Sequence, residues 1–222
     1  MINLTPRLMT AVQLAKGAKR IIDVGCDHGY LSAYMVTDGG ALFSYACDVN
    51  EGPLCKAKET IEQLNISDKV ETVLCDGLQP FDGSEADAVF ICGMGGELIA
   101  NILDSVAWTS KGEHSFILQP MTRSEKLREY LENNGYHIER EVFVKEDFRL
   151  YCVMLVKGGI GDCGRNNRYL YADSALKNTA FFDYVGSQLN KLKHIADEKV
   201  KAGHSVEEEM IAIKVLEDSN AH

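Results

Sequence analysis

The sequence predicts an α/β fold, in which a Rossmann-like, mostly parallel sheet with an antiparallel edge hairpin precedes a C-terminal α-helical hairpin. Three observations support this prediction. Short apolar runs alternate with segments of helical periodicity over about the first 156 residues, as in a sheet whose strands are joined by helices. The last two of these runs follow each other without a helix between them, and the chain beyond residue 180 shows only helical spacing.

The composition is that of a soluble globular protein with one sizeable domain, or one domain with a short appendage. The chain has 222 residues, of which 45% are apolar and 25% are charged. Neither the N-terminal residues nor any later apolar run resembles a signal peptide or a membrane span, so we expect a cytoplasmic protein. The seven cysteines include no C-x-x-C pair. We expect them to be buried residues in a reducing compartment, without a metal site.

The net charge of −10 argues against indiscriminate nucleic-acid binding, but the basic residues are segregated along the chain. Residues 1–20 contain four basic and no acidic side chains, and residues 165–201 contain seven basic and four acidic side chains. These segments predict either local contacts with nucleic-acid phosphates or ordinary solvated helix faces.

The chain begins with a predicted helix at residues 4–18, with Pro6 in its first turn and Gly17 at its end. A strand is expected at Arg20–Val24 and a helix at Tyr30–Thr37. The connecting turn has the pattern D-x-G-C-D-x-G, and its glycines let a ligand approach the backbone at a helix N-terminus.

This turn differs from the common phosphate-binding loops, since it has neither G-x-G-x-x-G nor a terminal Gly-Lys-Ser/Thr. Its two carboxylates, Asp23 and Asp27, would repel a pyrophosphate and would suit a ligand with an ammonium or a sulfonium group. The turn therefore points to S-adenosylmethionine as the ligand.

The next two predicted strands also end in acidic residues. A strand at 42–47 leads into Asp48, about 20 residues after the glycine turn, where Rossmann-like sites have a ribose-hydroxyl acceptor. Capping of a helix at 52–64 is the alternative role for Asp48. A strand at 70–75 precedes Asp76, which could accept a hydrogen bond from an adenine amino group or serve only the turn.

A fourth strand at 86–92 leads into Gly93-Met94-Gly95-Gly96, before a helix at 97–103. Three glycines leave a bare backbone surface at the carboxyl end of a central strand, where ligands bind in α/β sheets. A tight turn with a positive φ would explain one of these glycines better than all three.

The second half of the chain completes the sheet and adds the appendage. We expect a strand at 115–118 followed by Gln119-Pro120, a helix at Ser124–Asn133 ended by Gly135, and an antiparallel hairpin of strands at 137–144 and 148–156. The glycine-rich segment 158–164 predicts a boundary between a domain at 1–158 and a helical hairpin at 159–222.

Two helices are expected in this hairpin. The seam of the first has apolar residues at spacings of three and four: Phe182, Val185, Leu189, Leu192 and Ala196. Gly203 ends it, residues 205–208 fit a capping box, and the second helix has apolar residues at Met210, Ile213 and Leu216.

Together these motifs resemble the bacterial tRNA adenine-N1 methyltransferases that act on adenine 22 of the D-arm. The matching stretches are Leu4-Thr5-Pro6-Arg7-Leu8, the turn from Asp23 to Leu31, Gly52-Pro53, Asp76-Gly77-Leu78, Gly93-Met94-Gly95-Gly96 with Leu98-Ile99, Ile117-Leu118-Gln119-Pro120 and Arg149-Leu150-Tyr151. The helical hairpin resembles that family's C-terminal coiled-coil-like domain in placement. The chain departs from the family pattern at Cys26, Gly29 and Met121, where the family usually has Ser, Ala and Asn, and Asp48 stands where it often has Glu.

The resemblance implies a class I S-adenosylmethionine-dependent methyltransferase that methylates N1 of a tRNA adenine. From the cysteine spacing and the short apolar runs we expect no metal and no membrane partner. N1 has a free lone pair at neutral pH, so the protein must position the base and place negative potential where it becomes cationic. Asp27 is expected in that role, with capping of the following helix as the alternative. Because the base must be flipped out of its stack, an aromatic platform is expected, with Tyr30 preferred over Phe148 and Tyr151.

The expected catalytic residues are thus Asp27 and Tyr30, and two further groups complete the site. Residues expected to hold the cofactor are Asp23, Gly25, Cys26, Asp27, His28, Gly29, Asp48, Asp76, Gly77, Gly93, Met94 and Gly95. Residues expected to contact tRNA are Arg7, Gly96, Gln119, Lys191 and Lys193.

Two other functions are compatible with the motifs, namely methyl transfer to a protein or a small molecule and a non-catalytic nucleotide-binding module. An NAD-dependent oxidoreductase is disfavoured because the turn lacks G-x-G-x-x-G. The sequence does not specify the oligomeric state and is compatible with a monomer.

Overall fold

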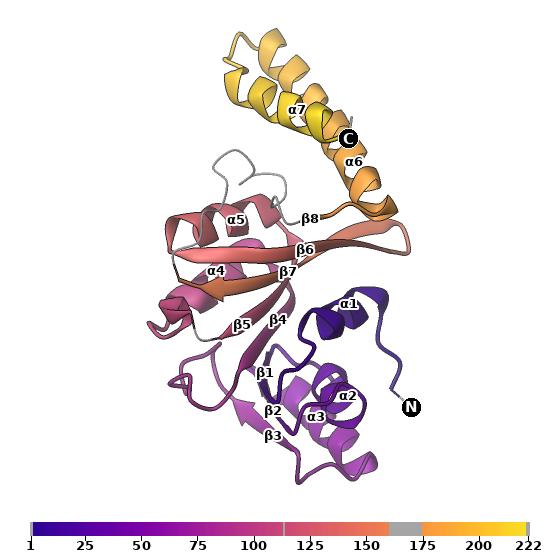
Figure 1. Ribbon diagram of the computed structural model, residues 1–222, viewed down its shortest axis with the longest axis vertical. Coiled ribbons are helices and arrows are strands. Elements are labelled where there is room, and N and C mark those ends of the chain that lie inside the picture. The colour runs from indigo at the N-terminus through magenta and orange to yellow at the C-terminus, as the bar shows by residue number, and fades with distance from the viewer. Residues whose placement is uncertain (1, 113, 160–174, 221–222) are drawn as a thin grey trace.

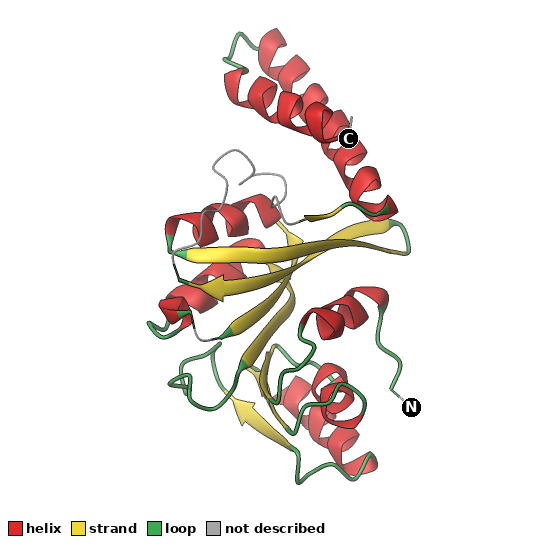
Figure 2. Ribbon diagram, viewed as in Figure 1, coloured by secondary structure: helices red, strands yellow, loops and turns green. Residues whose placement is uncertain are grey.

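The computed structural model describes residues 2–112, 114–159 and 175–220 and shows an α/β fold built on one eight-stranded sheet (Figures 1 and 2). The strand order is β3-β2-β1-β4-β5-β7-β6-β8. The strands are β1 (Arg20–Val24), β2 (Phe43–Asp48), β3 (Val70–Leu74), β4 (Ala88–Gly95), β5 (Ser115–Thr122), β6 (Tyr136–Glu146), β7 (Arg149–Gly158) and β8 (Ala175–Leu176). Strands β1 to β5 are parallel, and β7 is antiparallel to both β5 and β6. The predicted fold class is therefore confirmed.

The helices form two layers on the sheet and a hairpin beyond it. They are α1 (Pro6–Leu14), α2 (Tyr30–Thr37), α3 (Glu51–Gln63), α4 (Gly96–Asp104), the short 3-10 helix η1 (Thr109–Lys111), α5 (Ser124–Asn133), α6 (Thr179–Lys201) and α7 (Glu207–Asn220). Helices α1 to α3 lie on one face, α4 and α5 on the other, and α6 and α7 extend away from β6 and β8 (Figure 1). Among the described residues, no helix combines the length and apolarity that a membrane span requires.

Each face of the sheet has its own apolar core, because the central parallel strands are buried on both sides. Successive residues of β4 illustrate this division. Phe90 packs in the cluster that includes Leu31 of α2, and Ile91 packs in the cluster that includes Leu103 of α4. Phe90 and Ile91 are both fully buried. The two cores fix the sheet between its helices. Because β1 to β5 are parallel, their carboxyl ends lie along one edge of the sheet.

Strand β4 differs from its prediction. The sequence places its end at residue 92, whereas the strand continues to Gly95 beside a longer β5. The extra pairing is irregular, with register shifts between Cys92 and Met94 and between Met94 and Gly95. Gly93 has a φ of +83°, which glycine adopts without strain. The glycines therefore form a bulged strand end instead of a loop, and such bulges re-aim the backbone near functional sites.

The predicted antiparallel hairpin is present, but it is not the last element of the sheet. The two-residue strand β8 pairs with Glu141 and Val142 of β6 and so covers the outer side of that strand. Beneath this contact, Arg128 of α5 and Glu141 form an ion pair with only 1% and 0% of their side chains exposed. This buried pair lies where α5, the sheet edge and α6 meet.

The C-terminal helical hairpin is confirmed, but its predicted seam is partly wrong. Phe181 is fully buried against Phe143 of β6, with ring centroids 5.5 Å apart, whereas 37% of Phe182 is exposed. In α7, Met210 is 55% exposed, while Ile213 and Leu216 are buried. Helical spacing alone cannot choose between neighbouring phenylalanines, because contact with β6 decides which one is buried. Most of the predicted boundary at 158–164 lies outside the described residues.

Candidate active site

A cavity of about 230 Å³ opens where the strand order changes direction, between β1 and β4. Its walls come from the turn between Asp23 and Tyr30, from Arg7 and Leu8 of α1, and from Cys92 and Gly93 of β4. The chain passes from β1 to β2 on one side, while β4 lies on the other side. Ligands of open α/β sheets bind at this kind of switch point, outside the carboxyl ends of the strands.

Glycine is required at two positions of the turn for different structural reasons. Gly25 has a φ of +74° and Gly29 a φ of +70°, which favour glycine at both positions. A Cβ on Gly25 would collide with the end of the Met94 side chain, so the absence of a side chain lets β4 approach the turn. A Cβ on Gly29 would lie 3.0 Å from the Ala57 Cβ, so Gly29 is buried against α3. Gly25 therefore lines the cavity, and Gly29 supports the turn from behind.

Asp23 lies at the inner end of the cavity and is only 4% exposed. The hydroxyl of Ser32 donates a hydrogen bond of 2.8 Å to its Oδ2 atom. Burial raises the pKa of Asp23 to about 6, although the hydrogen bonds from Ser32 oppose this rise. A buried carboxyl group whose pKa is raised by burial is suited to a cationic partner, which stabilises its ionised form.

Asp27 lies at the cavity wall with 72% of its side chain exposed, and its Oδ1 atom is 3.8 Å from Nε2 of His28. It has a φ of +48°, which costs a non-glycine residue about 1–2 kcal/mol. The cap position of α2 is Gly29, and no side chain caps that helix. The alternative role of Asp27 as a helix cap is therefore wrong. Strained residues of this kind cluster at functional sites.

The three candidate aromatic residues lie in different environments. Tyr30 lines the cavity, is 48% exposed, and stacks on His28 with ring centroids 5.3 Å apart and planes 5° apart. Tyr151 is 8% exposed, and Phe148 is fully exposed at the turn between β6 and β7. Of these three residues, Tyr30 alone combines a place in the cavity wall with an exposed ring, and His28 supports that ring.

The acidic residues after β2 and β3 lie along the same edge of the sheet. Asp48 is partly exposed, and its Oδ1 atom accepts hydrogen bonds from the backbone N–H of Asn50 at 2.9 Å and from Asn50 Nδ2 at 3.4 Å. The cap of α3 is Asn50, without a side-chain bond, so Asp48 stabilises the turn and does not cap that helix. Asp76 is exposed, and Gly77 has a φ of +60° and packs against Ile102.

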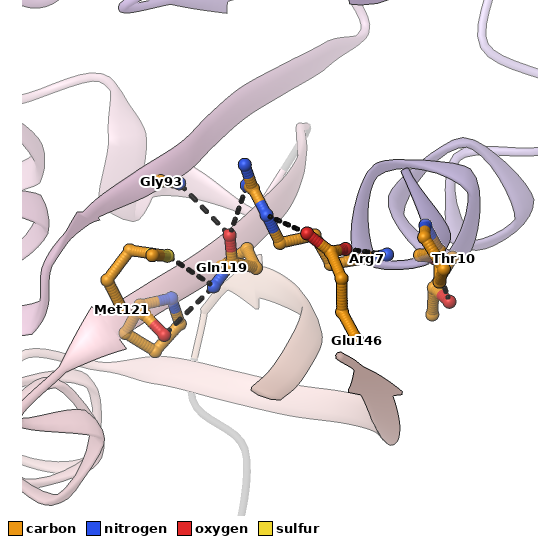
Figure 3. A network of polar contacts seen from close by, with 8 residues as sticks. Arg7, Thr10, Gly93, Gln119, Met121 and Glu146 are labelled. Carbon is orange, nitrogen blue, oxygen red and sulfur yellow. Dashed lines mark hydrogen bonds and ion pairs between the residues drawn. The ribbon is translucent and has the colours of Figure 1, made fainter. Parts of the chain in front are cut away.

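The expected tRNA contacts at the strand ends are less accessible than the sequence suggests. Gly96 is buried at the start of α4, where a Cβ would collide with the backbone of Arg123. Gln119 is fully buried, and its side-chain carbonyl accepts hydrogen bonds from Arg7 Nη1 at 2.9 Å and from the Gly93 N–H at 3.2 Å (Figure 3). Sequence reasoning missed Glu146, which binds Arg7 from 139 residues away along the chain. No local pattern signals a contact of that separation.

The thiols at the strand ends behave as small buried side chains. Cys26 and Cys47 are buried, Cys75 and Cys92 are partly exposed, and all are free. Burial raises the pKa of the thiols of Cys26 and Cys92. A hydrogen bond with Cys75 raises the pKa of Cys47. These three thiols are therefore neutral, and the site gives them no role as nucleophiles.

The helical hairpin is less basic than the sequence suggests. Residues 179–220 contain five lysines and eight acidic residues. Lys193 pairs with Glu217 at 2.8 Å, and Lys199 pairs with Glu209 at 2.7 Å. Lys191 is exposed and has no ion-pair partner within the described part of the chain. The sheet order separates this hairpin from the cavity, since β5, β7 and β6 follow β4 before the hairpin begins (Figure 1).

Comparisons with known proteins agree with this architecture. The chain is 29% identical to the tRNA (adenine(22)-N(1))-methyltransferase of Bacillus subtilis, over 98% of this chain and 94% of that protein. The crystal structure of the Bacillus subtilis M1A22 tRNA methyltransferase matches with a TM-score of 0.79 and 27% identity, over 100% of this chain and 97% of the other. A Streptococcus pneumoniae protein in complex with S-adenosyl-L-methionine matches with a TM-score of 0.82 and 26% identity, over 96% of this chain and 99% of the other.

A family model described as a methyltransferase domain matches residues 4–154. The match includes α1, the glycine turn, the bulged end of β4, Gln119 and Glu146, so it spans every wall of the cavity. It ends within β7, before the C-terminal hairpin. By the extent of this match and the fold of its sheet, the chain belongs to the methyltransferase-domain family.

Proposed function

We propose that this chain transfers a methyl group from S-adenosylmethionine to N1 of adenine 22 in tRNA. The observation that carries the proposal is the similarity to the Bacillus subtilis tRNA (adenine(22)-N(1))-methyltransferase, which extends over 98% of this chain. It covers both the sheet and the helical hairpin. We also propose that the protein works in the cytoplasm, where tRNA is found.

The residues at the cavity fit the proposed cofactor. Asp23 and Asp27 bring carboxylates to a wall that also has bare backbone at Gly25 and Gly93. A sulfonium and an ammonium group favour such carboxylates, and a pyrophosphate does not. The guanidinium of Arg7 does not offset this preference, because its Nε atom lies 3.4 Å from Glu146. When bound, S-adenosylmethionine supplies an electrophilic methyl group on its sulfonium.

Two residues further along the strand edge would complete the cofactor site. The Asp48 carboxylate follows β2 and would accept hydrogen bonds from ribose hydroxyls. Asp76 follows β3 and would accept from the adenine amino group of the cofactor. Both are at least partly exposed. Because β1, β2 and β3 are adjacent and parallel, a single extended ligand can reach all three strand ends.

The residues at the cavity mouth fit a flipped adenine. N1 of adenine needs no general base, so the protein's contribution is positioning and electrostatic stabilisation. The exposed ring of Tyr30, supported by His28, offers a stacking surface for the base. The exposed Asp27 carboxylate would stabilise the positive charge that the base acquires. Asp27 and Tyr30 are therefore the proposed catalytic residues.

The rest of the tRNA requires contacts outside the cavity. Lys191 is the unpaired candidate on α6, whereas the charge of Lys193 is already neutralised by Glu217. The basic N-terminal segment, with Lys16 and Lys19 exposed, is a second candidate surface for phosphates.

The proposal is tested by incubating the protein with labelled S-adenosylmethionine and bulk bacterial tRNA, and then analysing the nucleosides. Label in 1-methyladenosine supports the proposed reaction. Label in a protein or a small molecule would support the alternative methyltransferase functions, and no transfer at all would support a non-catalytic nucleotide-binding module. Either of these results would contradict the proposal.

A further inference from the structure

We propose that Arg7 and Gln119 are positioning residues that hold the Gly93 backbone at the cavity wall, and that neither of them contacts tRNA. The inference rests on the proposed function and deepens it, because it assigns a different role to two residues that the sequence places among the tRNA contacts. Arg7 comes from α1 and Gln119 from β5, and the two meet beside the bulged end of β4 (Figure 3).

The side-chain amide of Gln119 has its hydrogen-bonding capacity used inside the protein. Its carbonyl accepts from Arg7 Nη1 at 2.9 Å and from the Gly93 N–H at 3.2 Å. Its Nε2 atom donates to the Pro120 carbonyl at 3.0 Å and lies 3.6 Å from the sulfur of Met121. Figure 3 shows Gln119 at the centre of these contacts, with Gly93 and Arg7 at its carbonyl end and Met121 at its amide end.

These contacts also fix which way the amide points. A guanidinium N–H and a backbone N–H can only donate, so the end of Gln119 that faces both must be its carbonyl oxygen. A base that used Gln119 would have to break a hydrogen bond inside a fully buried group, at a cost of about 1–3 kcal/mol for each group left unsatisfied. Gln119 is therefore unsuited to be a substrate contact.

Arg7 is held on its other side by Glu146, at the end of β6. The Arg7 backbone N–H donates to Glu146 Oε2 at 3.1 Å, and Arg7 Nε lies 3.4 Å from Glu146 Oε1. Helix α1 starts at Pro6, and Thr5 makes no side-chain cap bond. Glu146 thus binds one of the free N–H groups of the first helical turn and a cationic side chain at once. With its side chain 21% exposed and its charge paired, Arg7 lacks the free guanidinium of a phosphate contact.

The network acts on Gly93, one of the glycines that line the cavity. Gly93 lies within the first register shift of β4, between Cys92 and Met94, with a φ of +83°, and its N–H is held by Gln119. Because the peptide unit is planar and trans, fixing that N–H also fixes the Cys92 carbonyl, which points the opposite way. Cys92 and Gly93 both line the cavity. Arg7 and Gln119 therefore set the orientation of a peptide plane in its wall.

A loosened wall should impair the chemical step more than binding. Misplacement of a substrate by about 1 Å can lower the rate by about 100-fold. We therefore expect Gln119→Met and Arg7→Lys to lower kcat at least tenfold, with KM for tRNA and the salt dependence of tRNA binding unchanged. Arg7→Lys is informative because lysine keeps the positive charge but has a single ammonium group. It therefore cannot bind Gln119 and Glu146 at the same time, as the planar guanidinium of arginine does.

Two comparisons sharpen this test. Lys69→Ala removes an exposed positive charge just before β3, at the opposite ends of the strands from the cavity, and should leave kcat unchanged. The double variant Arg7→Lys/Gln119→Met should lose no more activity than the worse single variant, because both act through one network. Losses that multiply in the double variant would overturn the inference. The inference would also be overturned if Arg7→Lys kept full kcat while Arg7→Met showed a raised KM for tRNA and a weaker salt dependence of tRNA binding.

A readout without cofactor or tRNA separates this inference from the proposed function. Hydrogen exchange at the Gly93 amide should be at least tenfold faster in Gln119→Met than in the wild-type protein, and unchanged exchange would overturn the inference. If Gln119→Met does not fold, Glu146→Gln takes its place, with the same expected direction for exchange and for kcat. If the wild-type protein methylates no tRNA, the proposed function fails, while the exchange result still decides whether the network holds Gly93.

Discussion

The buried carboxylate of Asp23 accepts a hydrogen bond of 2.8 Å from the hydroxyl of Ser32, which lies in the first turns of α2. This bond joins the end of β1 to the helix that follows the glycine turn. Burial nevertheless raises the pKa of Asp23 to about 6. The site therefore holds a carboxyl group whose charge depends on pH in the range where many enzymes are assayed.

A cationic ligand should bind better when Asp23 is ionised, so the affinity for S-adenosylmethionine should depend on pH. Because the pKa of Asp23 in the free protein is about 6, a proton must be released on binding below that pH. We expect the affinity, measured by calorimetry, to fall by up to about tenfold per pH unit below pH 6. In Asp23→Asn the affinity should be lower at pH 8 and nearly constant between pH 5 and pH 8. A wild-type affinity that is as constant as that of the variant would contradict this role of Asp23.

Replacement of Asp27 should separate binding from catalysis. Asp27→Asn keeps the size of the side chain and removes the negative charge at the cavity mouth. We expect the rate of methyl transfer to fall about 100-fold, which is typical for the loss of one electrostatic contact to a charged transition state. The affinity for S-adenosylmethionine should fall by a much smaller factor than the rate, because 72% of the Asp27 side chain is exposed and solvent screens its charge. Single-turnover kinetics and calorimetry on the same preparation measure both quantities, and a wild-type rate in the Asp27→Asn variant would remove Asp27 from the mechanism.

Lysines of α6 should differ in their contribution to tRNA binding. Replacing Lys191, Lys193, Lys199 and Lys201 together with Ala is expected to weaken binding and to flatten its salt dependence. Among single changes, Lys191→Ala should have the larger effect, and Lys193→Ala a smaller one, because Lys193 already pairs with Glu217 at 2.8 Å. Binding titrations at several salt concentrations measure these slopes. Unchanged slopes in the fourfold variant would show that the hairpin does not contact tRNA phosphates.

The buried pair of Arg128 and Glu141 should be sensitive to the loss of one partner. Glu141→Leu leaves a cation in a site where the Arg128 side chain is 1% exposed, and should cost about 3–5 kcal/mol of unfolding free energy. The double variant Arg128→Met/Glu141→Leu should recover most of this loss, because it leaves no buried charge. Urea unfolding measures both values. A double variant less stable than Glu141→Leu would show that the pair itself, and not the unpaired charge, determines stability.

Local signals predicted most of the fold. Strand β1 and helices α2 and α5 have the predicted bounds, because the apolar periodicity and the flanking glycines act within a few residues. These local signals did not predict where β4 ends. Its glycines suggest a loop, but pairing with β5 extends the strand through a bulge. Strand β8 has two residues, too few for any periodicity, and depends on its contact with β6.

The sequence predicted part of the cavity wall, but it did not predict the environments of the residues around it. The turn from Asp23 to Tyr30 does line one cavity with Gly93, because neighbouring parallel strands end at the same edge. The sequence could not show that Gln119 is fully buried or that Glu146 binds Arg7, since both depend on how α1 packs on the sheet. It also missed the ion pairs of α6, because the carboxylates that bind Lys193 and Lys199 come from α7.

The most direct test of the account is methyl transfer to a defined tRNA transcript, followed by primer extension. Methylation of N1 blocks the Watson–Crick edge of adenine, so the primer should stop at position 22 of a transcript with A22, and should not stop when that base is replaced by G. A stop in both transcripts, or in neither, with S-adenosylmethionine present would contradict the assignment of this chain to adenine 22 of tRNA.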